Sequence, residues 1–493
     1  MLHGGPPTVE LLRPVGPEIP SDERLLQVLD LCMQVGEVLL SSGESGADTS
    51  ATMTRLAAAC GLTTVDVDIT FTSITMCCHR GRVAVPVTSM RIVNYRTTDL
   101  TRLALVTRIV DQVVRGEMDV PAAVTALAEA VGAPHPYPRW AATAGWGGLA
   151  AAVAVLLGGA AVTAVTAFVV TAVIDRIGRL LSRWGVTSFF LQIVGGLVAT
   201  ASTLGLFAAG ALPPGTNPSL VIATSITVLL SGLSVTGAVQ DAIAGHVVTA
   251  AGRAAEIALS SAGLLTGVIL GLKVGLALGL TLDPAEPLAA DVAQFGISTL
   301  AAAIAAAMAA LASYAPLRSL AAAALAGGAG WATYGALTLF VHLGPVVATG
   351  LAAVVIGLAS TLFRRPRRYR HVIILAGIIP LLPGLTAYRG FYQLASARDV
   401  VDGLVTVTLA LAIGLALAAG VTAGQFLARP RPAPEITQPA AEGTVGAGGR
   451  THGNAEGRTG RDVSGDPGTE PADQETPRRA GGWRRWSPRR TTR

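Results

Sequence analysis

Long apolar stretches fill the middle of the chain, and polar stretches lie at its two ends. Ala, Leu, Val and Gly dominate from Gly145 to Ala428, whereas charged residues gather before Arg139 and after Arg429. A helix needs about 20 apolar residues to cross the hydrocarbon core of a bilayer. On that criterion the pattern predicts ten transmembrane helices, at residues 141–157, 159–174, 189–212, 219–239, 254–281, 288–312, 317–340, 343–362, 371–394 and 401–427.

The composition supports a membrane-embedded protein with soluble ends. Hydrophobic residues make up 51% of the 493 residues, charged residues make up only 14%, and the mean hydropathy is +0.56. A soluble protein carries about 25% charged residues. The sequence pI of about 9.3 could suggest a nucleic-acid partner. The excess arginines lie in predicted cytoplasmic loops and in the tail, however, so we expect a lipid bilayer and no nucleic acid as partner.

The distribution of arginine predicts how the helices are oriented. With a cytoplasmic N-terminus, the connections predicted outside are 213–218, 283–287 and 341–342, and none of them holds Lys or Arg. The connections predicted inside carry Arg176, Arg179, Arg183, Arg253, Arg318, Arg364, Arg365, Arg367, Arg368 and Arg370. This follows the positive-inside rule, with Arg398 as an exception. The N-terminus lacks the basic start and apolar core of a signal peptide. We therefore expect a multi-pass protein of the cytoplasmic membrane with both termini in the cytoplasm.

Two of the apolar segments are interrupted in the same way. Val228–Asp241 reads VLLSGLSVTGAVQD, and Ile379–Tyr392 reads IPLLPGLTAYRGFY. Small residues and a proline inside an apolar segment weaken the helix and free backbone groups. In a membrane such groups are tolerated only where they face protein or a water-filled cavity. Two such breaks in matching positions of two halves point to a transporter's substrate site.

The spacing of the two breaks also relates the other spans. Positions 229 and 381, which align in the two motifs, differ by 152. Adding 152 to the span starts 141, 189, 219 and 254 gives 293, 341, 371 and 406, each near a later span start. Five spans per half is an odd number, so the halves must cross the membrane in opposite orientation. We expect inverted membrane repeats at 139–283 and 284–428, with chance similarity of Gly- and Leu-rich helices as the alternative.

A small cytosolic α/β domain is expected at residues 21–138. Helical periodicity begins at Ser21 and recurs at 47–60, 97–114 and 120–131, whereas strands are predicted at 65–71, 72–78 and 83–87. About 110 residues are enough to bury a core. Residues 1–20 are rich in proline and are expected to be flexible. Residues 429–493 lack apolar periodicity and are expected to form a disordered basic tail.

This α/β domain also holds groups that could carry chemistry. The turn Ser41–Gly46 is rich in hydroxyl groups, and His79 follows two adjacent cysteines. A membrane-anchored enzyme with a hydrolase-like N-terminal domain therefore stays open as an alternative function. The simpler interpretation is a helix–helix turn and a histidine at a strand end. The four cysteines show no Cys-x-x-Cys or Cys/His metal spacing, which predicts reduced thiols, no metal and no cofactor.

Polar groups at the two breaks form the candidate transport site. The carboxylate of a zwitterionic amino acid would suit the exposed N–H groups of a half-helix that starts at Gly232 or Gly384. Arg389 would add a positive charge beside the second of these starts. The hydroxyl groups of Ser234 and Thr386 could recognise a small polar side chain. These five residues are the predicted substrate-binding set.

Ionisable residues within membrane helices are costly and are functional candidates by default. The substrate's ammonium group would suit Asp241 or Glu256, and a carboxylate there could also carry a coupling proton. Both residues lie near a predicted interface, so solvated loop charges are the alternative. Further candidates are Gln192, Lys273, Asp291 and Gln294.

The residues around the first break resemble a known family. Leu229–Glu256, LLSGLSVTGAVQDAIAGHVVTAAGRAAE, resembles the threonine/serine exporter family, whose motif is usually LLPGL followed by an Asp and an Arg-x-x-Glu. The second copy, Leu381–Leu385, keeps the proline. The runs SGESGADTSATMTRLAAACGL and DITFTSITM are similar to that family's cytosolic domain, so the resemblance spans about residues 22–427. Ser231, in place of the first proline, and His246, in place of an aromatic residue, depart from the pattern.

The resemblance implies a secondary exporter of small hydroxy amino acids, threonine or serine, driven by the proton gradient. The expected fold is an α-helical polytopic membrane protein of ten transmembrane helices in two inverted repeats, preceded by the α/β domain. The expected partner is a small amino-acid substrate, and a homo-oligomer stays open. An enzyme's anchor or a membrane scaffold would need neither ten spans nor paired breaks.

Overall fold

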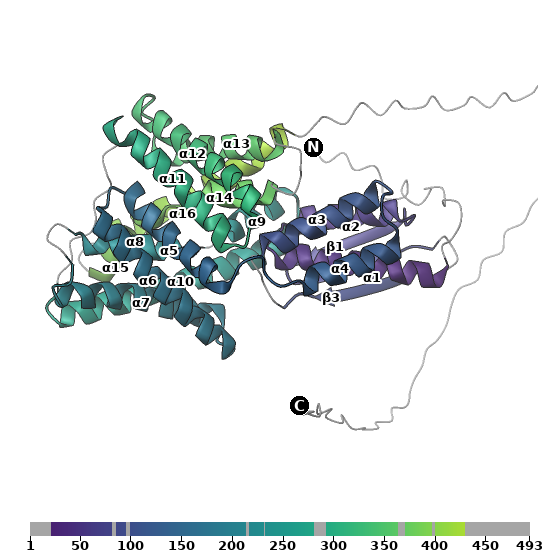
Figure 1. The fold of residues 1–493 in the computed structure, drawn as a ribbon, viewed down its shortest axis with the longest axis horizontal. Helices are drawn as coiled ribbons and strands as arrows, with labels where there is room; N and C mark the ends of the chain where they lie inside the picture. The colour runs from purple at the N-terminus through teal and green to yellow at the C-terminus, as the bar shows by residue number, and fades with distance from the viewer. Residues whose placement is uncertain are drawn as a thin grey trace, which may run out of the picture. The chain divides into compact units, whose positions relative to one another are not determined.

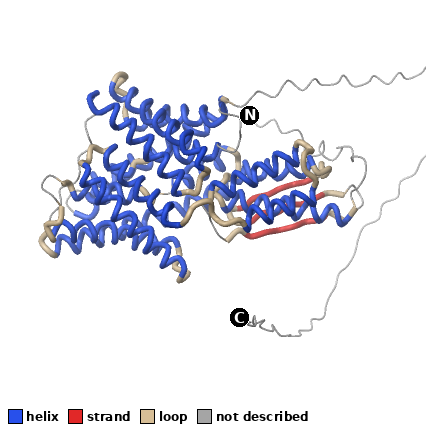
Figure 2. Tube along the Cα trace, viewed as in Figure 1, coloured by secondary structure: helices blue, strands red, loops and turns tan. Residues whose placement is uncertain are grey.

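The chain folds into helices with one small sheet near its N-terminus (Figure 1, Figure 2). The structure is a computed structural model, and it describes residues 21–80, 85–94, 99–212, 216–230, 232–280, 292–362, 370–396 and 400–428. The predictions for residues 1–20, for Asp291, for Arg398 and for the tail at 429–493 lie outside the described residues.

The first part of the described chain combines an antiparallel sheet with four helices. Its elements are α1 (Asp22–Ser41), α2 (Gly46–Ala59), β1 (Val65–Thr70), β2 (Ser73–Cys78), β3 (Val87–Ile92), α3 (Leu100–Val114) and α4 (Val120–Gly132). The sheet order is β1-β2-β3. Alternate residues of β2, beginning with Ile74 and Met76, are buried, whereas Asp66 and Asp68 of β1 are exposed. The sheet therefore buries one face, as the alternation of polar and apolar residues predicts.

Side-chain caps fix where three of these helices begin. The hydroxyl of Ser45 accepts a hydrogen bond from the amide of Asp48, and Asp99 and Asp119 cap α3 and α4 in the same manner. The strand predicted at 83–87 is misplaced, because β3 begins only at Val87. The prediction rested on the short apolar run before Val87, whereas the strand itself follows the alternation of polar and apolar residues up to Ile92.

The rest of the described chain is helical. It consists of α5 (Arg139–Leu156), α6 (Ala161–Arg183), α7 (Ser188–Ala208), α8 (Pro218–Thr227), α9 (Gly232–Ile243), α10 (Val247–Ala277), α11 (Val292–Ala312), α12 (Leu317–Leu339), α13 (Pro345–Leu362), α14 (Arg370–Ile378), α15 (Gly384–Ser396) and α16 (Val400–Leu427). Among the described residues, five helices are long and apolar enough to cross a membrane, and the bent pair α14 and α15 makes a sixth candidate. The chain is thus a mostly helical, multi-pass membrane protein.

Two predicted loops are helical instead. The second span was expected to end at residue 174, but α6 continues to Arg183. Asp175 and Arg179 form an ion pair one turn apart on this extension, and Arg183 lies in its last turn, where a positive charge favours the helix dipole. Likewise α10 begins at Val247 rather than at residue 254, so Arg253 lies on a helix and not in a loop.

Helix boundaries recur at a nearly constant interval in the two halves. α8 ends at residue 227 and α14 at 378, while α9 begins at 232 and α15 at 384. The differences are 151 and 152, close to the spacing of 152 between the two sequence motifs. The pair α5 and α11 packs in antiparallel fashion, because Gly145 lies against Ala312 and Gly148 lies against Met308.

Candidate functional site

Both helix breaks predicted from the sequence are present in the structure. α8 ends at Thr227, and α9 starts at Gly232. In the second half, α14 ends at Ile378, a 3-10 turn covers Ile379–Leu381, and α15 starts at Gly384. Pro380 and Pro383 lack an N–H group and cannot continue the helical hydrogen bonding, which accounts for the second break. The chain bends by 46° at this point.

The two breaks lie side by side. A β-carbon added to Gly384 would overlap the side chain of Thr227, so the start of α15 packs directly on the end of α8. The fully buried Tyr388 of α15 belongs to the same apolar cluster as Val221 and Ile222 of α8. The second break therefore docks on the first, and both lie within the helical core.

A cavity of about 550 Å³ opens at this junction, and we call it the second-break cavity. Its volume lies in the range of small-molecule sites, about 300–1,000 Å³. Thr227 lines it from the first break, and the run Ile379–Thr386 lines it from the second. Its other polar side chains are Gln294, Ser298, Tyr334, Thr338, Thr349, Arg389, Gln393 and Thr406.

Near its charged lining residue, the second-break cavity suits an anion better than a cation. Arg389 contributes a guanidinium, whereas none of the described lining residues is an Asp or a Glu. α15 begins at the cavity wall, where the amide of Gly384 donates to the carbonyl of Leu382 over 2.8 Å. The next two amides, of Leu385 and Thr386, have no intrahelical acceptor and can donate to a bound carboxylate. An ammonium group would have to be met by backbone carbonyls at the break or by ring faces.

Two aromatic rings on α12 supply such faces. Trp331 and Tyr334 both line the second-break cavity, and their ring centroids lie 5.2 Å apart. A cation above an aromatic face gains about 0.5–2 kcal/mol, depending on how far it is desolvated. The cavity thus offers groups for a carboxylate, for an ammonium and, through Thr338 and Thr386, for a hydroxyl.

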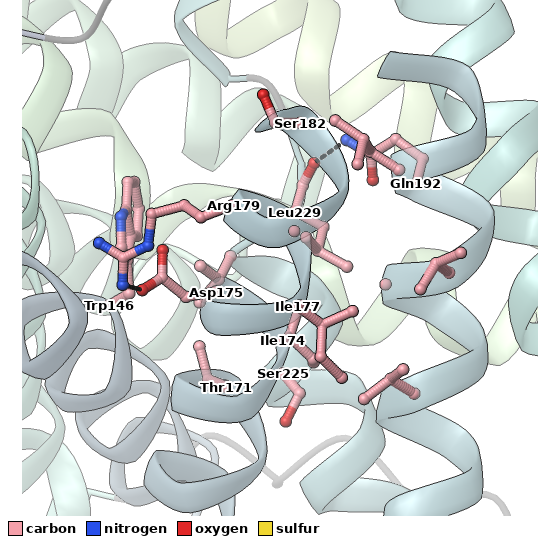
Figure 3. A pocket seen from close by; sticks show the side chains of 16 residues that line it. Trp146, Thr171, Ile174, Asp175, Ile177, Arg179, Ser182, Gln192, Ser225 and Leu229 are labelled. Atoms are coloured by element: carbon pink, nitrogen blue, oxygen red, sulfur yellow. Dashed lines mark hydrogen bonds and ion pairs between the residues drawn. The ribbon is translucent and has the colours of Figure 1, made fainter. Parts of the chain in front are cut away.

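A second cavity of about 370 Å³ lies beside the first break, and we call it the first-break cavity. Figure 3 shows Asp175 and Arg179 of α6 on one side of it and Gln192 of α7 on the other. The Gln192 side-chain amide donates to the backbone carbonyl of Leu229 over 3.1 Å. That carbonyl lies in the break, so Gln192 satisfies one of the acceptors that the interruption of the helix releases.

Asp241 has a different environment from the one predicted. Its carboxylate is fully buried and lies 3.2 Å from the Arg253 guanidinium. The amide of Gly46, at the start of α2, donates to Asp241 Oδ1 over 2.7 Å, and Arg253 donates to the carbonyl of Glu44 over 2.6 Å. Asp241 and Arg253 therefore hold the turn between α1 and α2, and the carboxylate caps the positive end of α2.

The structure brings together only part of the predicted site. Gly384, Thr386 and Arg389 line the second-break cavity. Ser234, Asp241 and Glu256 line neither cavity, and Gly232 is the first described residue of α9. The binding and proton-coupling roles of these residues stay predictions. Among the further candidates, Gln192 lines the first-break cavity, Gln294 lines the second-break cavity, and Lys273 is exposed on α10.

The lining residues that the sequence analysis did not single out include Asp175 and, on α12, Trp331, Tyr334 and Thr338. Asp175 was placed in a loop because the predicted span ended one residue earlier. Its spacing of four residues from Arg179 is the signal that could have indicated a helical ion pair. The three residues of α12 carry no such signal, because aromatic and hydroxyl groups are common on membrane helices.

The groups considered for enzymatic chemistry serve structural contacts. The hydroxyls of Ser41 and Ser42 both donate to the carbonyl of Val38 at the end of α1. His79 Nε2 lies 2.9 Å from Asp66 and 4.0 Å from the Cys77 sulfur. The same ring nitrogen faces both groups, so the imidazole cannot relay a proton from the thiol to the carboxylate as a catalytic triad does.

A multi-pass helical protein whose interrupted helices enclose a polar cavity has the features of a transporter. Two family models match the chain: "Putative threonine/serine exporter" at residues 30–275 and "Threonine/Serine exporter, ThrE" at residues 298–427. The chain belongs to the threonine/serine exporter family, and the resemblance seen in its motifs is thereby confirmed. This is a family of transporters and not of enzymes.

Two curated relatives are similar over most of their length. A "Probable threonine/serine exporter" of Mycobacterium tuberculosis is 38% identical over 417 residues, which cover 82% of this chain and 77% of the relative. The "Threonine/serine exporter" of Corynebacterium glutamicum is 32% identical over 439 residues, which cover 87% of this chain and 89% of the relative. No solved structure matches the chain at a significant level.

The contact between the two breaks can be tested with Gly384→Ala. The added methyl group overlaps Thr227, so we expect a loss of about 1–3 kcal/mol in the free energy of unfolding in detergent. Combining it with Thr227→Ala should recover part of this loss, because the two residues are in contact. Gly414→Ala is the control, since nothing lies within 4 Å of a β-carbon there. Equal effects of Gly384→Ala and Gly414→Ala would contradict the docking of the breaks.

The role of Asp241 at the α1–α2 turn can be tested with Asp241→Asn. Removing one partner of a buried ion pair costs about 3–5 kcal/mol. We expect a lower unfolding temperature and faster proteolysis near the turn. Asp68→Asn, at an exposed position of β1, should change stability by less than about 0.5 kcal/mol. A stable Asp241→Asn variant with an unchanged proteolysis pattern would argue against this role.

Proposed function

We propose that the protein exports threonine, serine or similar small hydroxy amino acids from the cytoplasm across the cytoplasmic membrane, driven by the proton gradient. The names of the two relatives support the substrate class. The observation that carries the proposal is the second-break cavity, where a helix start, a guanidinium and several hydroxyl groups line one space of suitable size. Both termini of the protein would lie in the cytoplasm.

The proposed architecture is ten transmembrane segments in two inverted repeats, at 139–283 and 284–428, behind a cytosolic domain at 21–138. The recurrence of the helix breaks at an interval of about 152 supports it. The antiparallel packing of α5 on α11, which are equivalent helices in the two repeats, is the arrangement that a two-fold axis in the membrane plane produces. α8 and α9 together would form one span, as would α14 and α15.

The proposed binding mode follows the groups around the second break. The substrate carboxylate accepts hydrogen bonds from the amides of Leu385 and Thr386 and from Arg389. The ammonium group lies against the Trp331 and Tyr334 rings and the carbonyls of the 3-10 turn. The substrate hydroxyl pairs with Thr386 or Thr338. A site that hydrogen-bonds a substrate hydroxyl rejects an analogue that lacks it, because its own polar groups are then left unpaired.

Proton coupling through Asp241 or Glu256 stays a prediction. Neither carboxylate lines the first-break or the second-break cavity. Protonation of Asp241 would weaken its ion pair with Arg253 and its hold on the α2 amides. A proton taken up there would therefore act on the α1–α2 turn before it acted on a substrate in the second-break cavity.

The proposal is tested by efflux of radiolabelled threonine from vesicles that contain the full-length protein. Arg389→Gln should raise the KM for threonine about tenfold or more, because hydrogen bonds to charged groups contribute about 1.5–3 kcal/mol. Arg389→Lys should retain part of the affinity, because the charge remains while the paired donors are lost. Lys273→Gln, which removes a positive charge outside both cavities, should leave KM unchanged.

Unchanged threonine efflux in Arg389→Gln would place the substrate elsewhere. Competition with valine, which is nearly isosteric with threonine but lacks the hydroxyl, tests the substrate class: we expect valine to compete poorly. An uncoupler added to the same vesicles should abolish uphill export while leaving exchange intact. Uphill export that persists without a proton gradient would refute the coupling to protons but not the export of threonine.

A further inference from the structure

The two cavities occupy equivalent positions in the two halves of the chain. Five lining residues of the first-break cavity have a lining residue of the second-break cavity 152 positions later. The pairs are Trp146 and Ser298, Arg179 and Trp331, Ser182 and Tyr334, Val228 and Pro380, and Leu229 and Leu381. The same backbone frame thus surrounds both spaces, although the side chains differ.

The cavities lie at opposite ends of the helical bundle. The first-break cavity is lined by Trp146 near the start of α5 and by Ser182 near the end of α6. The second-break cavity is lined by Gln294 and Ser298 near the start of α11. Because α11 runs antiparallel to α5, its start lies at the end of the bundle away from the start of α5. Both cavities border the first break, because Val228 and Leu229 line the first-break cavity and Thr227 lines the second-break cavity.

The first-break cavity carries its own set of recognition groups. Asp175 and Arg179 present a negative and a positive charge side by side. The hydroxyls of Thr171 and Ser225, on side chains 1% and 0% exposed, have no hydrogen-bond partner among the described residues. Leaving buried polar groups without partners costs free energy, which a bound polar molecule can recover.

We propose that the first-break cavity is a second binding site for a small zwitterionic hydroxy amino acid, used at the opposite membrane face from the second-break cavity. This inference rests on the proposed function. The substrate's ammonium binds Asp175, its carboxylate binds Arg179, and its hydroxyl pairs with Ser225 or Thr171. The zwitterion takes the place of the internal ion pair, so each charged side chain exchanges one oppositely charged partner for another.

The surroundings of Arg179 favour this exchange. Its guanidinium also donates to the hydroxyl of Thr143 and, over 3.4 Å, to the carbonyl of Arg139. These bonds to α5 hold the guanidinium in place when Asp175 turns to the substrate. A helix-stabilising ion pair would need no such anchoring, no cavity beside it and no unpaired hydroxyls opposite it. Under the proposed topology this site faces the cytoplasm, where export begins.

The test measures the KM for threonine separately at each face, by counterflow in vesicles that contain the full-length protein in a known orientation. We expect Asp175→Asn and Arg179→Gln to raise KM about tenfold at one face only, equivalent to about 1.4 kcal/mol. Arg389→Gln should raise KM at the other face. Asp175→Glu should restore the affinity in part. Arg176→Gln, an exposed neighbour that lines neither cavity, should change KM at neither face.

Equal changes of KM at both faces, or a lower maximal rate with KM unchanged at both faces, would show that the pair only stabilises the helix, and the inference would fall. If the wild-type protein transports threonine and the Asp175→Asn variant has the same KM at both faces, the second site is refuted and the proposed function stands. A wild-type protein that moves neither threonine nor serine in either direction would refute the proposed function, and this inference with it.

Discussion

Gly384 and Thr227 pack against each other where two interrupted helices meet, and even a methyl group at Gly384 would overlap the threonine side chain. Interrupting a helix in an apolar environment releases N–H and C=O groups that need partners. Here the partners are neighbouring helices, as when Gln192 donates to the carbonyl of Leu229, and the polar walls of a cavity. The close contact keeps both breaks packed against neighbouring helices.

The two cavities follow from this junction. Each break removes a turn of helix from a tightly packed bundle, and the space beside it is lined by the helices that would otherwise have covered that turn. Because α5 and α11 run antiparallel, the residues near their starts that line the two cavities lie toward opposite ends of the helical bundle. Under the proposed function, a small movement of α9 or α15 at this junction would change which of the two cavities is accessible.

Hydropathy and the spacing of Gly and Pro were sufficient to predict both breaks and the place of Arg389 beside one of them. They could not predict that Asp241 contacts Gly46, because those residues are 195 positions apart and the contact depends on how α9 packs on α2. Asp175 was missed because a charged residue at the end of an apolar run marks a loop and a helix extension equally well. The roles of Trp331 and Tyr334 depend on the cavity, which only the fold creates.

The α1–α2 turn is connected to the first break through direct contacts of α9. Asp241 lies on α9, the helix that starts at the break, and it binds both Arg253 of α10 and the amide of Gly46. Gly237 leaves the room that the Arg253 guanidinium occupies, since a β-carbon there would overlap it. If α9 moves during transport, it must either carry the turn with it or break a buried ion pair, at a cost of several kcal/mol. The position of α9 and that of the sheet-bearing segment are therefore energetically coupled.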